Sequence, residues 1–218
     1  MKQVYCISGF AADRRVFSGI DFRGHSVHFV DWIVPVPDES IEAYAARLRA
    51  AILHDAPVLL GLSFGGMMCI EIAKLIPTEK VIIVSSVKTR HELPRWMPVT
   101  GRLQLDRLLP LKSFELIKPI EDYNLGLEGP EERTLVEEYR DRLDPVYANW
   151  AIPQILNWEN EWVPGNIVHI HGKKDHIFPI RRIHADHVVE DGGHFMIMNR
   201  AASINPTLRR ILDNGRAA

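Results

Sequence analysis

Short, mainly apolar runs recur along the chain, and segments with helical periodicity separate them. These runs are rich in β-branched and aromatic residues, and the central ones are apolar at every position, not at alternate positions. Such runs are typical of parallel strands covered on both faces. The expected strands are 4–7, 27–32, 58–60, 81–84, 167–170 and 187–190.

Helical patterns lie between these strands. The expected helices are a short one capped by Asp13, one capped by Ser40 that continues to Ile52, one from Met67 to Leu75 that Pro77 ends, and one over 207–212. Strands that alternate with helices predict an α/β protein with an open, mostly parallel sheet and helices on both faces.

One long segment, residues 88–163, breaks this alternation. It contains no convincing strand, and its prolines and leucines indicate several short helices inserted between two strands. The predicted organisation is therefore a core of residues 1–87 and 164–218 with a helical insertion at 88–163. Trp150, Trp158 and Trp162 are expected to anchor the insertion to the core; the alternative is that some of them line an apolar substrate pocket.

Composition narrows the class of protein. The 218 residues are 46% hydrophobic and 25% charged, as in ordinary globular domains, and the net charge of −2 gives no reason to expect a nucleic-acid or membrane-surface partner. The uncharged run between Asp55 and Glu71 is too short and glycine-rich for a membrane span. Cys6 and Cys69 match no zinc or redox motif, so we expect reduced thiols, or at most one disulfide, and a cytoplasmic protein.

Residues 61–65 have the form G-x-S-x-G, with Ser63 at the centre. They follow an apolar strand and precede a helical segment, which is the setting that a nucleophile elbow requires. In such a turn the serine backbone is strained, the glycines permit close chain approach, and the hydroxyl projects above a helix N-terminus. Ser63 is therefore the candidate nucleophile; the alternative is an ordinary turn between strand and helix.

A serine hydroxyl needs a base, and His194 is the best placed of the ten histidines. It lies in the glycine-rich loop 191–195 after the last expected strand, where loops face the ligand crevice of open α/β sheets. Asp175, just after the strand 167–170, is the candidate carboxylate that fixes the imidazole tautomer. The alternative acid position, in residues 85–88, holds no carboxylate. For both residues the competing interpretation is a solvated loop position.

A cluster of histidines near Asp175 raises the question of a metal site. His169, His171, Asp175 and His176 could suggest a metal site, with the first two on one side of a strand. However, three residues separate His171 from Asp175, where the H-x-H-x-D-H pattern has one. We therefore expect core or loop histidines, with no metal and no cofactor.

Acyl transfer also needs backbone N–H groups directed at the developing oxyanion. One is expected from Phe64, directly after Ser63, and the other from the loop after the first strand. In that loop Phe10 is the first choice and Ala11 the next. For Phe10 the alternative is simple wall packing.

With these residues assembled, the sequence resembles the α/β-hydrolase superfamily. The chain order of Ser63, Asp175 and His194 is the one that this fold uses. Gly9-Phe10 resembles the oxyanion strand end of the family, except that Ser8 stands where histidine is common, which removes a supporting side chain. The segments 171–179 and 192–195 resemble the acid and histidine loops, and the insertion falls where the family carries a helical cap.

The resemblance implies an α/β-hydrolase fold without the first two antiparallel strands of the family, so that about six mostly parallel strands remain. It also implies a serine hydrolase that cleaves a carboxylic ester or thioester of a small to medium acyl substrate, without a cofactor. One alternative is a lyase or C–C bond hydrolase on the same fold and triad, and a second is a non-catalytic ligand-binding protein. The expected partner is a small-molecule substrate, and the sequence carries no signal for the oligomeric state.

Overall fold

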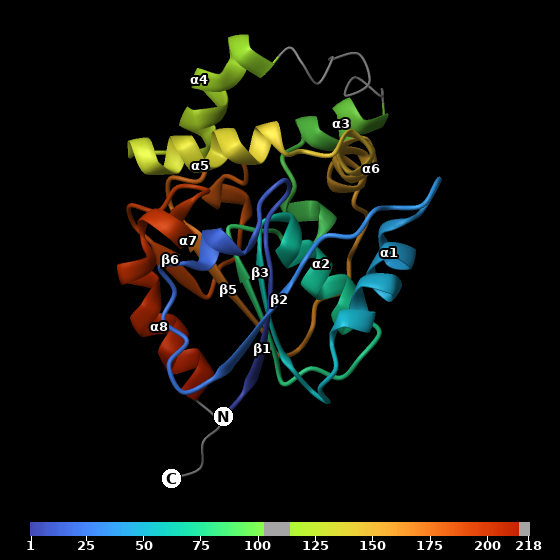
Figure 1. Cartoon of the computed structure of the whole chain (residues 1–218), viewed down its shortest axis with the longest axis vertical. Coiled ribbons are helices and arrows are strands. Elements are labelled where there is room, and N and C mark those ends of the chain that lie inside the picture. The colour runs from blue at the N-terminus through green and yellow to red at the C-terminus, as the bar shows by residue number, and fades with distance from the viewer. Residues whose placement is uncertain (103–113, 214–218) are drawn as a thin grey trace.

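A six-stranded sheet forms the centre of the computed structural model, which describes residues 1–102 and 114–213 (Figure 1). The strand order is β2-β1-β3-β4-β5-β6, and each neighbouring pair is parallel. The strands are β1 (Gln3–Ile7), β2 (Ser26–Val30), β3 (Val58–Leu62), β4 (Lys80–Val84), β5 (Ile167–Gly172) and β6 (His187–Val189). Each expected strand overlaps one of these six, so the predicted α/β architecture is confirmed.

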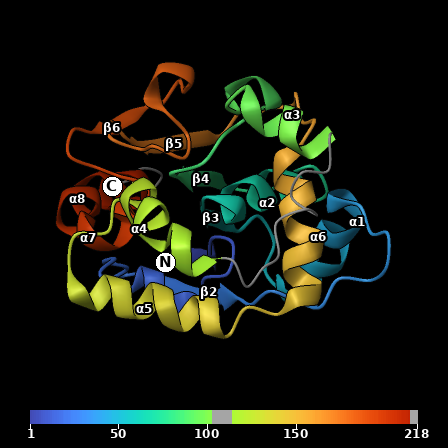
Figure 2. The same ribbon diagram turned by 90° about the horizontal axis from the view of Figure 1, so that it is seen from above.

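Helices cover both faces of the sheet, with α1 and α2 on one side and α7 and α8 on the other (Figure 2). Strand side chains alternate between two apolar clusters: Tyr5 and Leu59 belong to one, Cys6 and Leu60 to the other. The helices are α1 (Ile41–Leu48), α2 (Phe64–Ala73), α3 (Trp96–Arg102), α4 (Phe114–Leu125), α5 (Pro130–Asp141), α6 (Pro145–Leu156), α7 (Met196–Asn199) and α8 (Ala201–Asp213). Short 3₁₀ helices are η1 (Arg14–Phe17), η2 (Arg49–Ala51), η3 (Arg90–Glu92) and η6 (Ile180–Arg182).

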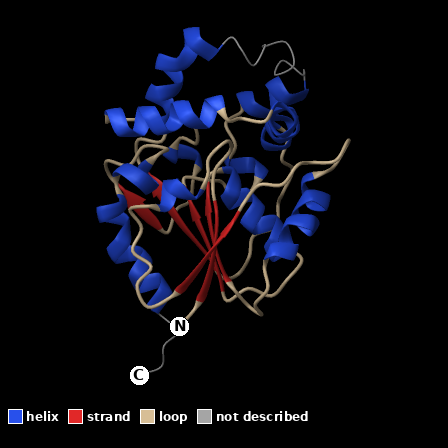
Figure 3. Cartoon of the chain, in the orientation of Figure 1, coloured by secondary structure: helices blue, strands red, loops and turns tan. Residues whose placement is uncertain are grey.

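The helices α3 to α6 lie across the end of the sheet where the parallel strands finish (Figure 3). They come from the segment expected to form an insertion of short helices. The division into a core of 1–87 and 164–218 and a cap of 88–163 remains a prediction. The leucines expected to contribute to this insertion at positions 103, 105, 108, 109 and 111 lie outside the described residues.

Local sequence signals explain several helix starts. The side chain of Ser40 accepts a hydrogen bond of 3.2 Å from the Ala43 amide, and Asp13 accepts one of 2.9 Å from the Arg15 amide. Both residues therefore cap the first turns of their helices as predicted, because they satisfy amides that have no partner within the helix.

Several predicted boundaries differ from the structure. Helix α8 begins at Ala201 and not at 207: Pro206 lies inside it, and the helix buries an apolar stripe that includes Ile204 and Leu208. Burial of that stripe outweighs the loss of one helical N–H. Helix α2 begins at Phe64 and not at Met67, directly after the elbow. Strand β2 ends at Val30, before the two residues that were expected to continue it.

Two tryptophans attach the α6 region to the core. The Trp150 indole N–H donates to the Glu39 carbonyl at 2.8 Å, and its ring stacks on Tyr44 with centroids 4.1 Å apart. The Trp158 indole N–H donates to the buried carboxylate of Glu71 at 2.8 Å. The anchoring role holds for these two, whereas Trp162 is 45% exposed.

Two properties of the chain as a whole follow from the described residues. No helix within 1–102 or 114–213 has the length and apolar character needed to cross a membrane. Cys6 and Cys69 are both buried free thiols. They belong to different apolar clusters, which explains why they do not form the single disulfide that the sequence left open.

Candidate active site

Ser63 occupies a strained turn between β3 and α2. Its backbone has φ 52° and ψ −119°, a conformation that non-glycine residues rarely adopt. A Cβ on Gly61 would lie 2.3 Å from the Gly65 carbonyl oxygen, so the chain can turn this sharply only with glycine there. The Ser63 amide donates to the Val84 carbonyl at 2.9 Å, and the Ser86 hydroxyl donates to the Ser63 carbonyl at 2.7 Å. The turn is thus fixed by hydrogen bonds to the last residue of β4 and to the segment that follows it.

Three side chains from distant parts of the sequence form one hydrogen-bonded chain. His194 Nε2 lies 2.9 Å from Ser63 Oγ, and His194 Nδ1 lies 2.9 Å from Asp175 Oδ2. The carboxylate only accepts hydrogen bonds, so the imidazole proton belongs on Nδ1 and Nε2 is left to accept from the serine hydroxyl. The structure therefore brings together the residues predicted as nucleophile, base and acid.

Asp175 is buried, with 3% of its surface exposed, and its second oxygen is also satisfied. Oδ1 accepts from the Ile177 amide at 2.9 Å and from the Phe178 amide at 2.8 Å. Burial alone would raise the pKa of Asp175, but the charge and hydrogen bond of His194 outweigh it and hold the pKa below its ordinary value. The carboxylate is thus suited to remain ionised beside the imidazole.

The loop after β1 faces the elbow. A Cβ on Gly9 would lie 3.5 Å from the Cβ of Ser63. Ser8 Oγ donates to the Ala12 carbonyl at 2.7 Å, and the Trp32 indole N–H lies 3.1 Å from Ser8 Oγ and 3.2 Å from the Gly9 carbonyl oxygen. Ser8 and Trp32 thus support this loop with side-chain hydrogen bonds in place of the histidine that is common in the family. Sequence reasoning missed Trp32 because it placed this residue in β2, and no spacing links it to Ser8.

Phe10 and Phe64 flank this part of the site. Within residues 1–102 and 114–213, neither of their amide N–H groups donates a hydrogen bond to another residue. The Phe64 ring stacks on Trp32 with centroids 5.1 Å apart, and the Phe10 ring stacks on Tyr147 of α6 at 5.8 Å. Phe10 thus has the wall packing considered as its alternative, and both amides remain available as donors.

The histidines of the suspected metal pattern are engaged elsewhere. His169 and His171 face the same side of β5, as expected, and both are fully buried. His169 Nε2 lies 3.1 Å from His171 Nδ1, and His171 Nε2 lies 2.8 Å from the Phe178 carbonyl oxygen. His176 stacks on Tyr123 of α4. In the described part of the chain, no group of three or more His, Cys, Asp or Glu side chains is arranged to hold a metal ion.

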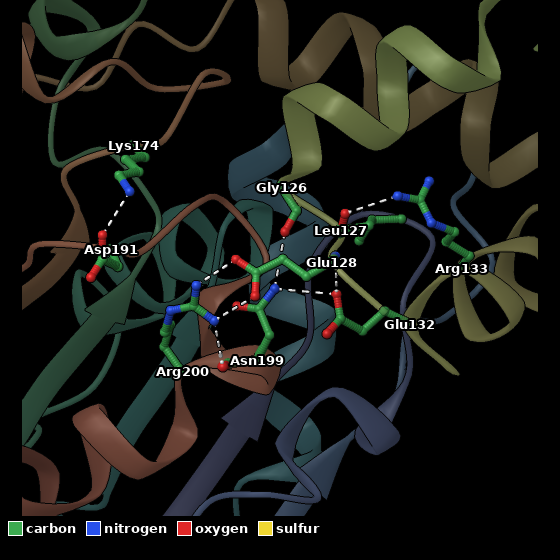
Figure 4. A network of polar contacts seen from close by, with 9 residues as sticks. All are labelled: Gly126, Leu127, Glu128, Glu132, Arg133, Lys174, Asp191, Asn199 and Arg200. Carbon is green, nitrogen blue, oxygen red and sulfur yellow. Dashed lines mark hydrogen bonds and ion pairs between the residues drawn. The ribbon is translucent and has the colours of Figure 1, made fainter. Parts of the chain in front are cut away.

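The turn between α4 and α5 packs on the loop that carries His194. Figure 4 shows Asn199 and Arg200 reaching this turn from the α7 region. The contacts are a 2.9 Å hydrogen bond from the Phe195 amide to the Leu125 carbonyl, a 3.0 Å hydrogen bond from Asn199 Nδ2 to the Gly126 carbonyl, and a bidentate ion pair between Arg200 and Glu128. No pattern in the sequence indicates this contact, because it joins segments about 70 residues apart.

A six-stranded parallel sheet with a strained serine elbow and a His–Asp pair at its carboxyl edge defines an α/β hydrolase. The chain belongs to the alpha/beta hydrolase family, whose sequence profile matches residues 4–205. It is a hydrolase enzyme by this membership. No curated protein sequence matches it.

Solved structures share the fold at low sequence identity. A hydrolase from Oleispira antarctica is 12% identical with a TM-score of 0.74, and the match covers 99% of this chain and 92% of that chain. An esterase from Exiguobacterium antarcticum is 15% identical with a TM-score of 0.72, over 98% and 92% of the two chains. A thermophilic esterase from Thermogutta terrifontis is 17% identical with a TM-score of 0.71, over 97% and 89%.

Proposed function

We propose that the protein hydrolyses a carboxylic ester or thioester of a small to medium acyl substrate through an acyl-enzyme on Ser63. The observation that carries the proposal is the continuous hydrogen-bonded chain from Asp175 through His194 to Ser63 Oγ. A buried carboxylate, a correctly oriented imidazole and a strained serine are the groups that acyl transfer to serine requires.

In the first step, Ser63 Oγ attacks the carbonyl carbon of the substrate while its proton passes to His194 Nε2. The imidazolium that forms is stabilised by Asp175, which lies 2.9 Å away on the other side of the ring. The new oxyanion is proposed to accept hydrogen bonds from the amides of Phe10 and Phe64, since both are free of other partners among the described residues.

Collapse of the tetrahedral intermediate breaks the bond to the leaving group. His194 then returns its proton to the departing alkoxide or thiolate, and the acyl group remains on Ser63. In the second step a water molecule, deprotonated by His194, attacks the acyl-enzyme. The bond between the acyl carbon and Ser63 Oγ then breaks, His194 returns the proton to Ser63 Oγ, and the carboxylic acid is released. No residue outside this set is needed for proton transfer.

The surroundings of the proposed oxyanion donors support an apolar substrate group. The rings of Phe10, Phe64, Trp32 and Tyr147 pack against one another beside the elbow. Apolar walls exclude water, which strengthens the interaction of the amides with a developing negative charge. Two of the structural neighbours are named as esterases, which is in line with the same chemistry.

The alternatives are a lyase or C–C bond hydrolase that uses the same three residues, and a ligand-binding protein without activity. The second alternative is disfavoured because a binding protein has no use for a strained serine within hydrogen-bond distance of a histidine. The first is separated from ester hydrolysis by its substrates: β-diketones and cyanohydrins in place of phenyl esters.

The test is hydrolysis of p-nitrophenyl esters from acetate to octanoate by the wild type and by Ser63→Ala. The control variant is Ser18→Ala, because Ser18 is exposed and lies outside the elbow. We expect activity in the wild type and Ser18→Ala and none in Ser63→Ala, with the same pattern for labelling by a fluorophosphonate. Labelling of Ser63 without hydrolysis of any ester would contradict the esterase assignment and favour lyase or C–C chemistry. Absence of both from a folded protein would contradict the role of Ser63.

A further inference from the structure

Two fully buried histidines of β5, His169 and His171, have no part in the reaction proposed above. Their rings meet edge to face with centroids 5.0 Å apart, and His171 contacts Phe178, which follows Asp175 in the chain. Burying an imidazole costs free energy unless its nitrogen atoms are hydrogen-bonded, so a buried pair of them needs a physical explanation.

The hydrogen bonds fix the direction in which this pair donates. The Phe178 carbonyl can only accept, so the proton of His171 lies on Nε2, 2.8 Å away. His171 Nδ1 then carries a lone pair and accepts from His169 Nε2–H at 3.1 Å. His171, with one nitrogen donating and the other accepting, is therefore neutral, and burial lowers the pKa of both His169 and His171 below the ordinary value, which favours the neutral form of each ring.

Phe178 is the residue through which this pair reaches the site. Its amide donates to Asp175 Oδ1 at 2.8 Å, while its carbonyl accepts from His171. Phe178 is 2% exposed, and its ring packs edge-on against His194, with centroids 5.5 Å apart. Phe178 thus contacts the proposed acid, the proposed base and His171. Its position therefore affects the geometry of Asp175 and His194.

His171 also lies close to the carboxylate itself, with Nε2 3.6 Å from Asp175 Oδ2, the oxygen that faces His194. Because His171 donates to the Phe178 carbonyl, it does not compete with His194 for this oxygen. A second proton on His171 would face the Nε2–H of His169, donor against donor, so the His169 bond favours the neutral ring.

We propose that His171 is a positioning residue of the Ser63 site, which holds the Phe178 carbonyl and thereby fixes Asp175 and His194, while His169 selects its tautomer. The role rests on the proposed esterase function. It differs from the roles of Ser63, His194 and Asp175 because His171 touches none of the reacting atoms. Removing its donor would leave the Phe178 carbonyl as a buried acceptor without a partner and would free the acid loop to shift.

The test compares two amide substitutions. The glutamine side-chain nitrogen lies as many bonds from Cα as imidazole Nε2, whereas that of asparagine lies one bond closer and cannot reach the Phe178 carbonyl. We expect His171→Gln to keep kcat for p-nitrophenyl butyrate within about threefold of the wild type. We expect His171→Asn to lower kcat about 10- to 100-fold with KM nearly unchanged, since misplacement of the acid affects the chemical step and not substrate binding.

A matched control is His28→Asn in β2. His28 Nε2 also bonds an oxygen, Gln3 Oε1 at 2.8 Å, but on a strand two positions away from the elbow strand β3. This variant should lose thermal stability without loss of kcat. Equal kcat in folded His171→Gln and His171→Asn would overturn the positioning role even though ester hydrolysis by the wild type would still stand.

A second measurement needs neither a variant nor activity. Nitrogen-15 chemical shifts of the wild-type histidines report which ring nitrogen carries the proton. We expect His171 with its proton on Nε2, unchanged between pH 6 and 8. A proton on Nδ1, or a ring that titrates in this range, would overturn the proposal. If the wild type hydrolysed no ester, the function proposed for Ser63 would fail, and this measurement would still decide the state of His171.

Discussion

Gly126 and Gly193 meet backbone to backbone: a Cβ on Gly126 would lie 3.2 Å from Gly193 Cα. Gly126 also has φ +72°, which strains any other residue. We expect Gly126→Ala to lower the free energy of unfolding by about 1–2 kcal/mol. It should also lower ester turnover, because Gly193 precedes His194 and would have to move. Urea unfolding and kcat measurements check both effects.

Gly165→Ala is the control for that substitution. A Cβ at Gly165 meets nothing within 4 Å, and its φ is not positive. This variant should keep wild-type turnover. Its free energy of unfolding should be unchanged or raised by up to about 1 kcal/mol. If Gly126→Ala behaved in the same way, the contact between the α4–α5 turn and the His194 loop would have no influence on the site.

Asp175→Asn should reduce kcat by about 10⁴-fold while leaving the fold intact. The asparagine oxygen can still accept from the Ile177 and Phe178 amides, but its NH₂ group would then face His194 Nδ1. His194 would have to carry its proton on Nε2 and could not accept one from Ser63. Steady-state kinetics and circular dichroism check this. The control is Asp191→Asn, which removes an exposed ion pair with Lys174 and should change kcat by less than about twofold. Near-normal turnover in Asp175→Asn would mean that another carboxylate is the acid.

The pH dependence of stability should reflect the lowered pKa of Asp175. In the folded state this pKa lies below its ordinary value of 3.8, so the unfolded chain takes up the proton first as the pH falls. The contribution of the carboxylate to stability is therefore fully present at a pH well above 3.8 and is lost as the pH falls through the folded pKa. The difference in unfolding free energy between the wild type and Asp175→Asn should be constant above about pH 5 and shrink below it. Denaturant titrations at several pH values measure this, and a difference that shrinks between pH 8 and 6 would contradict the assigned direction.

Trp158→Phe should destabilise the protein by about 1.5–3 kcal/mol, because it removes a hydrogen bond to a buried carboxylate. Glu71 is 2% exposed, and its Oε1 accepts from the Trp158 indole at 2.8 Å. Urea unfolding gives the value, with Trp162→Phe as the control, since Trp162 is 45% exposed. Equal stability of the two variants would show that Lys74, the other partner of Glu71, satisfies the carboxylate alone.

Much of the fold and of the candidate site could be predicted because the relevant signals are local. Apolar runs mark strands that are buried on both faces, and this pattern located the four inner strands β1, β3, β4 and β5, while the half-exposed edge strands β2 and β6 were located from weaker runs. The glycines around Ser63 encode the sharp turn directly, since no other residue fits at Gly61. His194 and Asp175 were found because loops after parallel strands meet at one edge, whatever their separation in sequence.

Other features depend on contacts that no local pattern encodes. The last helix was expected only over 207–212, yet burial of the apolar stripe of α8 extends the helix back to Ala201, through Pro206. Trp32 lies beyond the end of β2, where its indole hydrogen-bonds Ser8. The α4–α5 turn contacts the region of the His194 loop although about 70 residues separate the two segments in the sequence.

The sequence by itself therefore determined the α/β class, the order of the strands and of the candidate residues along the chain, and the identity of the three residues of the candidate site. It could do so because side-chain burial and backbone conformation are written into residues close to one another. Only the tertiary structure decided the partners of His169 and His171, the support of the Ser8 loop and the anchoring of the helices above the sheet. Those depend on packing between distant segments, where many side chains of similar size and polarity would satisfy the same local pattern.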